Sequence, residues 1–295
     1  MLSNDVCRER QQQRGHVIAL HCSGSDARQW RQLGEMLGPR YELLTPEHYG
    51  SAATGPWTGT HAFTLADEAV RTIALIDATA RNVHLVGHSY GGAIALHAAL
   101  ERPGRVETLT LYEPSAFHLL KQIDAGGADA LAEIAAIARL TGDGAVTGDY
   151  QGAATAFIDY WSGNGTWATL RPELRSALTQ WLPKAPLDFT ALIGEPTKAS
   201  DYARLRCSTL IIRGERAPLP TRLIAEALPT LLPNARLTVV AGAGHMGPLT
   251  HAAEVNAVIC RHLAGVEVHG PHAPLVAPAG SRDRGMQRNS NQPAT

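Results

Sequence analysis

From His16 onward, short apolar runs alternate with longer segments whose apolar residues recur at helical spacing. Short apolar runs are typical of buried strands, and strands separated by helices pair in parallel because a parallel connection needs a crossover. The pattern therefore predicts an α/β fold with a mostly parallel sheet of about six strands wrapped by helices. The expected strands are 16–22, 41–46, 82–89, 106–113, 208–215 and 235–242, and the expected helices are 27–37, 65–80, 91–101, 221–232 and 250–263.

One helix start has additional local support. Thr64 is followed three residues later by Asp67. This spacing fits a capping box, in which the hydroxyl and the carboxylate accept hydrogen bonds from backbone amides that have no partner inside the helix.

The alternation stops between Pro114 and about Cys207, where alanine-rich segments such as 128–140 predict a helical insertion. We therefore expect an α/β core in residues 1–114 and 207–265, a helical lid in 115–206, and a disordered tail in 266–295, which is rich in Pro, Gly, Ser, Asn and Arg. Aromatic residues of the insertion could line a substrate cavity, although a single aromatic side chain more often fills a core. They include Phe157, Tyr160, Trp161, Trp167 and Trp181.

Composition excludes several classes of protein. Of the 295 residues, 44% are hydrophobic and 18% are charged, which suits a packed core, and a formal net charge of −1 without a basic run disfavours nucleic acid as a partner. The four cysteines are far apart and form no C-x-x-C pair, so neither a metal site nor a disulfide framework is expected. The polar N-terminus and the lack of an 18-residue apolar stretch predict a cytoplasmic protein without membrane association.

The segment GHSYGG, from Gly87 to Gly92, follows an expected strand and precedes an expected helix. G-x-S-x-G in this context forms a sharp turn that exposes a nucleophilic serine at the carboxyl end of the sheet. Gly87 and Gly91 are needed there because a Cβ atom would collide with neighbouring backbone. Ser89 is the predicted nucleophile.

A serine hydroxyl needs a neighbouring base to take its proton. His245 is the candidate, because it lies in the small-residue loop AGAGHMGP directly after the last expected strand. His88 is a weaker candidate because its side chain should point away from Ser89, and His251 falls inside an expected helix.

Negative charge that forms on a substrate carbonyl oxygen must meet backbone N–H groups that are already in place. The residue after the nucleophile, Tyr90, supplies one such amide. The loop after the first strand, 21–25, should supply the other, with Ser23 in the donor position.

These residues together resemble the α/β-hydrolase superfamily, in particular its lid-bearing members that are esterases, C–C hydrolases or haloperoxidases. The resemblance covers about residues 16–264 and implies that fold. In such enzymes one motif carries the nucleophile, one forms the oxyanion loop, here with Cys22 in place of the usual glycine, and one carries the histidine. The matching segments are GHSYGG (87–92), LHCSGS (20–25) and GAGHMGP (242–248).

The acid of the triad departs from the common pattern. Most relatives place an aspartate two or three residues after the glycine that ends the penultimate strand, but Gly214 is followed here by Glu215, Arg, Ala and Pro. Some relatives instead place the acid after the strand that follows the nucleophile, where this chain has Glu113. We therefore expect Glu113 to be the partner of His245, with Glu215 as the alternative acid.

A second departure lies at the N-terminus. The family commonly begins with two further strands, but only about 15 polar residues precede His16. The strand 41–46 should then be the edge of the sheet, and its unpaired groups could join a second copy in a homodimer.

The resemblance implies a serine hydrolase that acts on a small-molecule ester-like substrate. Ser89 would attack a carbonyl, the Tyr90 and Ser23 amides would hold the oxyanion, and His245, oriented by Glu113, would move the proton. No cofactor is required. The alternatives are a C–C bond hydrolase, a thioesterase or a cofactor-free perhydrolase on the same fold, and a non-catalytic ligand-binding module.

Overall fold

The computed structural model describes residues 15–51 and 53–265. Their strands form one six-stranded sheet in the order β2-β1-β3-β4-β5-β6, and every neighbouring pair is parallel. The α/β class and the six parallel strands are thus confirmed. The strands are β1 (Gly15–Leu20), β2 (Tyr41–Leu44), β3 (Val83–His88), β4 (Val106–Tyr112), β5 (Ser208–Gly214) and β6 (Ala235–Val240).

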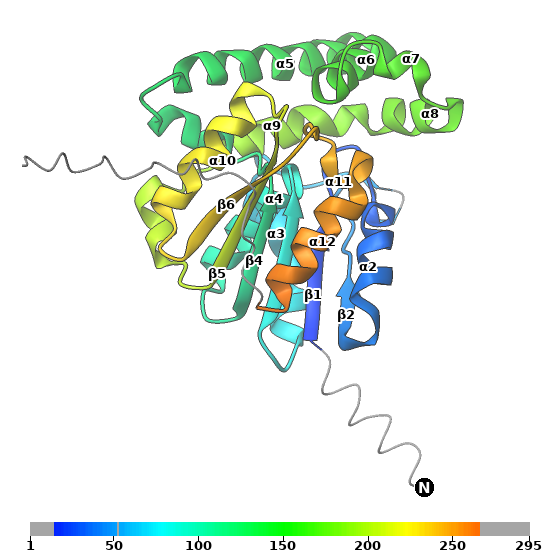
Figure 1. Ribbon diagram of the computed structural model, residues 1–295. Coiled ribbons are helices and arrows are strands. Elements are labelled where there is room, and N and C mark those ends of the chain that lie inside the picture. The colour runs from blue at the N-terminus through cyan, green and yellow to red at the C-terminus, as the bar shows by residue number, and fades with distance from the viewer. Residues whose placement is uncertain (1–14, 52, 266–295) are drawn as a thin grey trace, which may run out of the picture.

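Helices cover both faces of this sheet (Figure 1). On one face α2 (Arg31–Leu37) and α12 (Ala252–Leu263) share a buried apolar cluster with side chains of β1, β4 and β5. On the other face α3 (Leu65–Ala78), α4 (Tyr90–Glu101) and α10 (Leu219–Leu231) pack into a larger cluster. Because both faces are buried, the strands carry nearly continuous apolar runs, as the sequence indicated.

Local signals explain several helix boundaries. The predicted capping box of α3 is confirmed, since Thr64 Oγ1 accepts from Asp67 N and Thr64 N donates to Asp67 Oδ2 over 2.9 Å. The helix expected over 250–263 is wrong at its start. The backbone of His251, with φ −129° and ψ 42°, separates α11 (Gly247–Thr250) from α12.

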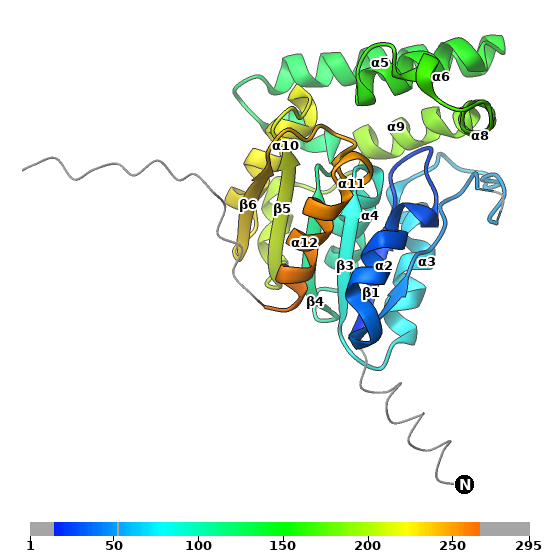
Figure 2. The same cartoon turned by 45° about the vertical axis from the view of Figure 1, so that its right-hand side comes forward.

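Between β4 and β5 the described chain contains helices and no strand. They lie over the carboxyl ends of the strands, so that they cover the edge where Ser89 emerges (Figure 2). The division of the chain into a core and a separate lid stays a prediction. These helices are α5 (Gly127–Thr147), α6 (Tyr150–Ser162), α7 (Thr166–Thr169), α8 (Pro172–Trp181) and α9 (Ala185–Gly194). Short 3-10 helices at Ala27–Trp30, Gly38–Arg40, Phe117–Gln122, Leu182–Lys184 and Ala199–Arg204 complete the fold.

The strand β2 forms one edge of the sheet, as predicted, and β6 forms the other. A homodimer across β2 stays a prediction. The segment 1–14, where two further strands were considered absent, and the expected disordered tail 266–295 lie outside the described residues.

Candidate active site

The turn between β3 and α4 places Ser89 at the carboxyl end of the sheet. Its backbone has φ 54° and ψ −115°, a left-handed conformation that costs energy for a residue with a Cβ atom. The turn is tight because a Cβ atom on Gly87 would lie 2.5 Å from the Gly91 carbonyl oxygen, and one on Gly91 would collide with the Leu20 carbonyl oxygen. The sequence folds this way because glycine occupies both contact positions.

His245 reaches Ser89 from the loop after β6. Its Nε2 lies 2.9 Å from Ser89 Oγ, and its ring is 3% exposed. The loop is fixed by Tyr112, whose hydroxyl donates to the Gly244 carbonyl over 2.7 Å and contacts Gly247 so closely that a Cβ atom would not fit there.

His88 supports the His245 loop without touching Ser89 Oγ. Its Nε2 donates to the His245 carbonyl oxygen over 2.9 Å, and its Nδ1 therefore accepts from the Gln29 side-chain amide over 3.2 Å. Burial, and then the nearby His245 ring, hold the pKa of His88 well below its usual value. The neutral ring is the form that this donor and acceptor arrangement requires. Sequence reasoning set His88 aside as a base and did not find this supporting contact.

Glu113 follows β4 and is completely buried. Its Oε2 lies 2.8 Å from His245 Nδ1 and accepts from the Thr221 hydroxyl over 2.9 Å, while Oε1 accepts from the Gly214 amide over 2.8 Å. Two fixed donors, one on each oxygen, thus orient this carboxylate toward His245 Nδ1. The structure therefore brings Ser89, His245 and Glu113 into one hydrogen-bonded chain.

Glu215 is not part of this chain of contacts. It is exposed, and its Oε2 accepts from the Gly242 amide over 2.8 Å. The Glu215 side chain therefore stabilises the turn after β6, whereas Glu113 is the carboxylate that contacts His245.

The two residues predicted to supply oxyanion-hole amides, Tyr90 and Ser23, line the same cavity as Ser89. Tyr90 begins α4, so its N–H is one of the helix amides without a partner inside the helix, and it carries the positive end of the helix dipole. Ser23 lies in the loop after β1 and lines the same cavity as Ser89. Neither amide donates a hydrogen bond to another group of the described residues, so both can donate to an oxygen of a bound molecule.

A second serine contacts the nucleophile. Ser115 Oγ lies 3.0 Å from Ser89 Oγ, and Ser115 is 2% exposed. Sequence reasoning missed it. The available signal was its position two residues after Glu113, at the same carboxyl edge of the sheet.

A buried ionic network adjoins the site and was also missed. Lys184 Nζ donates to Glu68 Oε2 over 2.7 Å and to Asp188, while the Tyr90 hydroxyl donates to the same Glu68 oxygen over 2.8 Å. Asp188 Oδ2 in turn accepts from the Ser23 hydroxyl over 2.7 Å. The network joins α3, the helical segment and both residues whose amides were predicted to form the oxyanion hole.

Burial governs the charges in this network. It raises the pKa of Asp188 above its usual value, against the opposing effect of Lys184. Burial alone would lower the pKa of Lys184, but Asp188 and Glu68 outweigh it and raise that pKa, so the ammonium stays charged. Burial also lowers the pKa of the adjacent His48 well below its usual value. A buried cation between two carboxylates is costly to disrupt, because each remaining charge would be left without a partner.

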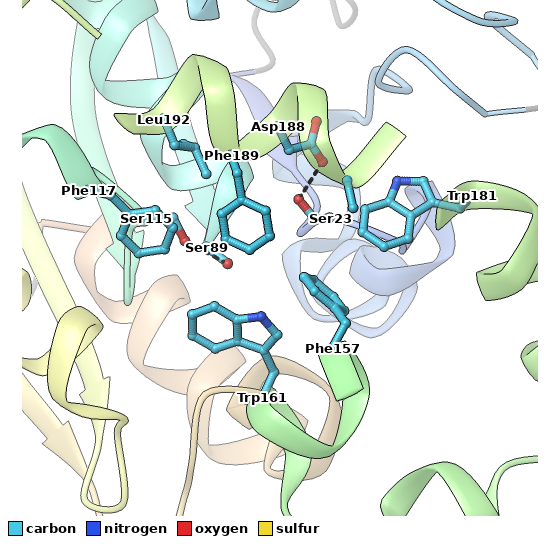
Figure 3. A pocket seen from close by; sticks show the side chains of 11 residues that line it. Ser23, Ser89, Ser115, Phe117, Phe157, Trp161, Trp181, Asp188, Phe189 and Leu192 are labelled. Carbon is cyan, nitrogen blue, oxygen red and sulfur yellow. Dashed lines mark hydrogen bonds between the residues drawn. The ribbon is translucent and has the colours of Figure 1, made fainter. Parts of the chain in front are cut away.

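A cavity of about 910 Å³ opens over Ser89. A smaller pocket, called the deep end below, adjoins this cavity at Ser89 and is mostly apolar. Figure 3 shows its aromatic side chains around the space between Ser89 and Ser23, with Asp188 and Ser23 on the polar side of the wall. The residues at the deep end include Phe117, Phe157, Trp161, Trp181, Phe189 and Leu192. The Trp161 ring lies 4.3 Å from the His245 ring, centroid to centroid. Phe157, Trp161 and Trp181 therefore line the cavity, whereas Trp167 packs in an apolar cluster of the helical segment.

Two further properties bear on the class of protein. Across residues 15–51 and 53–265 no group of three or more His, Cys, Asp or Glu side chains has an arrangement that could hold a metal ion. No helix in the same residues is both long enough and apolar enough to cross a membrane.

Comparison with known proteins places the fold in a family. Residues 17–258 match the model of the alpha/beta hydrolase family. The chain is 28% identical over 244 residues to the polyketide synthase ThaQ of Burkholderia thailandensis, a match that covers 80% of this chain and 11% of ThaQ. It is 32% identical over 100 residues to the lipase LipV of Mycobacterium tuberculosis, covering 34% of this chain and 37% of LipV. These matches span less than two thirds of either relative.

The solved structures show the same architecture. MGS-M2, an alpha/beta hydrolase from a Medee basin deep-sea metagenome library, superposes with a TM-score of 0.71 at 17% identity, covering 88% of this chain and 92% of that one. At this identity the likeness concerns the fold. The family model spans most of the sheet and includes Ser89, Glu113 and His245. It shows that the chain belongs to the α/β-hydrolase family.

Proposed function

We propose that the protein is a serine hydrolase that cleaves a carboxylic ester or a related acyl bond through an acyl-enzyme. The observation that carries the proposal is the continuous chain of contacts from Glu113 to His245 to Ser89, with distances of 2.8 and 2.9 Å, at the floor of a cavity. Nucleophile, base and orienting acid in this arrangement are the parts that acyl transfer needs.

In the acylation step Ser89 Oγ attacks the substrate carbonyl carbon while its proton moves to His245 Nε2. The carbonyl oxygen becomes an oxyanion, which the amides of Tyr90 and Ser23 stabilise. Glu113 holds His245 in the tautomer with a proton on Nδ1 and stabilises the imidazolium. The imidazolium then gives its proton to the leaving alcohol, and the acyl group remains on Ser89.

Deacylation repeats the sequence with water in place of Ser89. His245 Nε2 takes a proton from the water, whose oxygen attacks the acyl carbon. The second tetrahedral intermediate expels Ser89 Oγ, which recovers its proton from His245.

The cavity indicates an apolar substrate. Aromatic rings surround Ser89 at the deep end, so an apolar acyl or alcohol group gains from leaving water there. The similarity to LipV, whose name describes a lipase, supports the same substrate class. In this proposal the helical segment 115–206 serves as a lid, because α6, α8 and α9 supply much of the cavity wall.

The proposal is tested by labelling with a fluorophosphonate probe and by hydrolysis of p-nitrophenyl butyrate. Wild-type protein should be labelled at one site and should hydrolyse the ester, and Ser89→Ala should do neither. Glu215→Gln is the matched control and should behave as wild type. Wild-type protein that is folded yet neither labelled nor active on p-nitrophenyl esters would refute the proposal.

A further inference from the structure

The Ser115 side chain contacts Ser89 Oγ, the atom proposed as the nucleophile. Its Oγ lies 3.0 Å from Ser89 Oγ, and both side chains line the deep end of the cavity (Figure 3). The hydroxyl is not needed to hold the turn, because the backbone already does so. Ser115 N donates to the Ser89 carbonyl over 3.0 Å, and Phe117 N donates to the Ser115 carbonyl over 2.8 Å.

The direction of the hydrogen bond between the two hydroxyls follows from the rest of the chain of contacts. Both Glu113 oxygens already accept hydrogen bonds, one from the Gly214 amide and one from the Thr221 hydroxyl, so the carboxylate is the acceptor for the proton on His245 Nδ1. The neutral ring then has its lone pair on Nε2, which accepts the proton of Ser89 Oγ over 2.9 Å. Because Ser89 donates its only hydroxyl proton to His245, it is the acceptor in its contact with Ser115. The Ser115 hydroxyl is therefore the donor.

We propose that Ser115 is a further catalytic residue, whose hydroxyl donates a hydrogen bond to Ser89 Oγ while that oxygen carries negative charge. The inference rests on the proposed serine hydrolase function. A hydrogen bond to a charged oxygen is about twice as strong as one to a neutral oxygen. The contact is thus stronger in the transition state than in the resting enzyme, which is the condition for accelerating a reaction.

The role applies to both halves of the reaction. During acylation the serine proton passes to His245, and Ser115 stabilises the partial negative charge on Ser89 Oγ until the bond to the acyl carbon forms and the charge passes to the carbonyl oxygen. During deacylation that bond breaks, its electron pair returns to Oγ, and Oγ takes its proton back from His245. Ser115 keeps its own proton throughout and donates the same hydrogen bond to the departing Ser89 Oγ.

The test is pre-steady-state kinetics of Ser115→Ala with p-nitrophenyl acetate, together with the rate of fluorophosphonate labelling. We expect acylation, deacylation and labelling each to slow by about 10- to 100-fold, with little change in KM, because one donor to a charged oxygen is lost. Ser115→Cys keeps a weaker donor and should slow the same steps by less. The matched control is Ser208→Ala, which also removes a serine hydroxyl that contacts a second side chain, here His262, but lies outside the cavity.

The outcomes are separable from those of the main proposal. If wild-type protein is labelled and Ser115→Ala is labelled within about twofold of the wild-type rate, Ser115 has no catalytic role although the serine hydrolase function stands. A rise in KM with unchanged acylation and labelling rates would also overturn the inference. Only failure of wild-type labelling concerns the proposed function itself.

Discussion

The amide of Gly214 donates a hydrogen bond of 2.8 Å to Glu113 Oε1. Gly214 ends β5, the strand after which most related hydrolases carry their acid. In this chain β5 supplies a backbone donor to an acid that comes from β4. The end of β5 thus holds in place the carboxylate that contacts His245, although that carboxylate follows β4.

This arrangement predicts unequal effects of two conservative substitutions. Glu113→Gln keeps the shape of the side chain but removes the charge that stabilises the imidazolium, and its amide group would face the Gly214 and Thr221 donors. Ester hydrolysis should fall by about 10²- to 10⁴-fold. Glu215→Gln should retain nearly full activity because Glu215 contacts the Gly242 amide instead of His245. Steady-state kinetics on p-nitrophenyl butyrate would reverse the assignment if Glu215→Gln were the inactive variant.

A second prediction concerns the residues that exchange the proton. Ser89→Ala and His245→Ala should each lower kcat by several orders of magnitude, and the double variant should be hardly slower than either single variant, because the residues act as one unit. Circular dichroism should show that all three variants are folded. A single variant that keeps more than about a tenth of wild-type turnover would contradict the mechanism.

The buried network predicts a large effect on stability. Lys184→Met removes the cation that contacts Glu68 and Asp188 and leaves two buried carboxylates without it. The free energy of unfolding should fall by about 3–5 kcal/mol in urea titrations. Arg102→Met, which breaks the ion pair with Asp77 at the surface, is the control and should change stability far less. Equal effects of the two substitutions would show that the network does not stabilise the fold.

Stability should also decline on mild acidification. Burial lowers the pKa of His262 to about 4, from 6.5 as its ordinary value. Between these pH values the unfolded chain binds a proton at this site that the folded protein does not, so stability rises with pH through the window and is lost as pH falls below about 6.5. The shift corresponds to roughly 3 kcal/mol.

The check is the pH dependence of urea unfolding in wild type and His262→Gln. The variant should show a shallower loss of stability between pH 6.5 and 4. Other buried histidines, His118 among them with a pKa lowered to about 4, will leave part of the slope in place. Identical slopes in the two proteins would rule out the contribution of His262.

The sequence was informative where local pattern alone determines structure. The strands were found because a strand buried on both faces must be apolar along its whole length. The turn at Ser89 was found because the collisions at Gly87 and Gly91 allow only glycine. The contact between Glu113 and His245 could be anticipated because Glu113 follows β4, and the ends of neighbouring parallel strands meet at one edge of the sheet.

The buried network was missed because it depends on contacts between distant segments. Glu68 and Lys184 are 116 positions apart. Glutamate and lysine usually lie on the surface, so neither residue type indicates burial. One signal was present: Glu68 lies on the same helical face as Leu65 and Thr72, both of which are buried. The sequence also could not tell which aromatic residues of the helical segment line the cavity. Trp161 lines it and Trp167 fills a small core, and the packing of α6, α7 and α8 decides between the two positions.

The backbone around Ser89 also determines how the enzyme should lose activity on heating. Ser89 N donates to the Tyr112 carbonyl, and Ser115 N donates to the Ser89 carbonyl, each over 3.0 Å, so nucleophile and acid are tied to one interior strand pair. His245 instead follows β6, which is an edge strand, and its loop is joined to β3 and β4 by single side-chain hydrogen bonds from His88 and Tyr112. Loops open locally at a lower free energy than the strands of the core. Inactivation should therefore begin with departure of the histidine while β3 and β4 remain protected from hydrogen exchange, and cooling should restore activity without any need to refold the centre of the sheet.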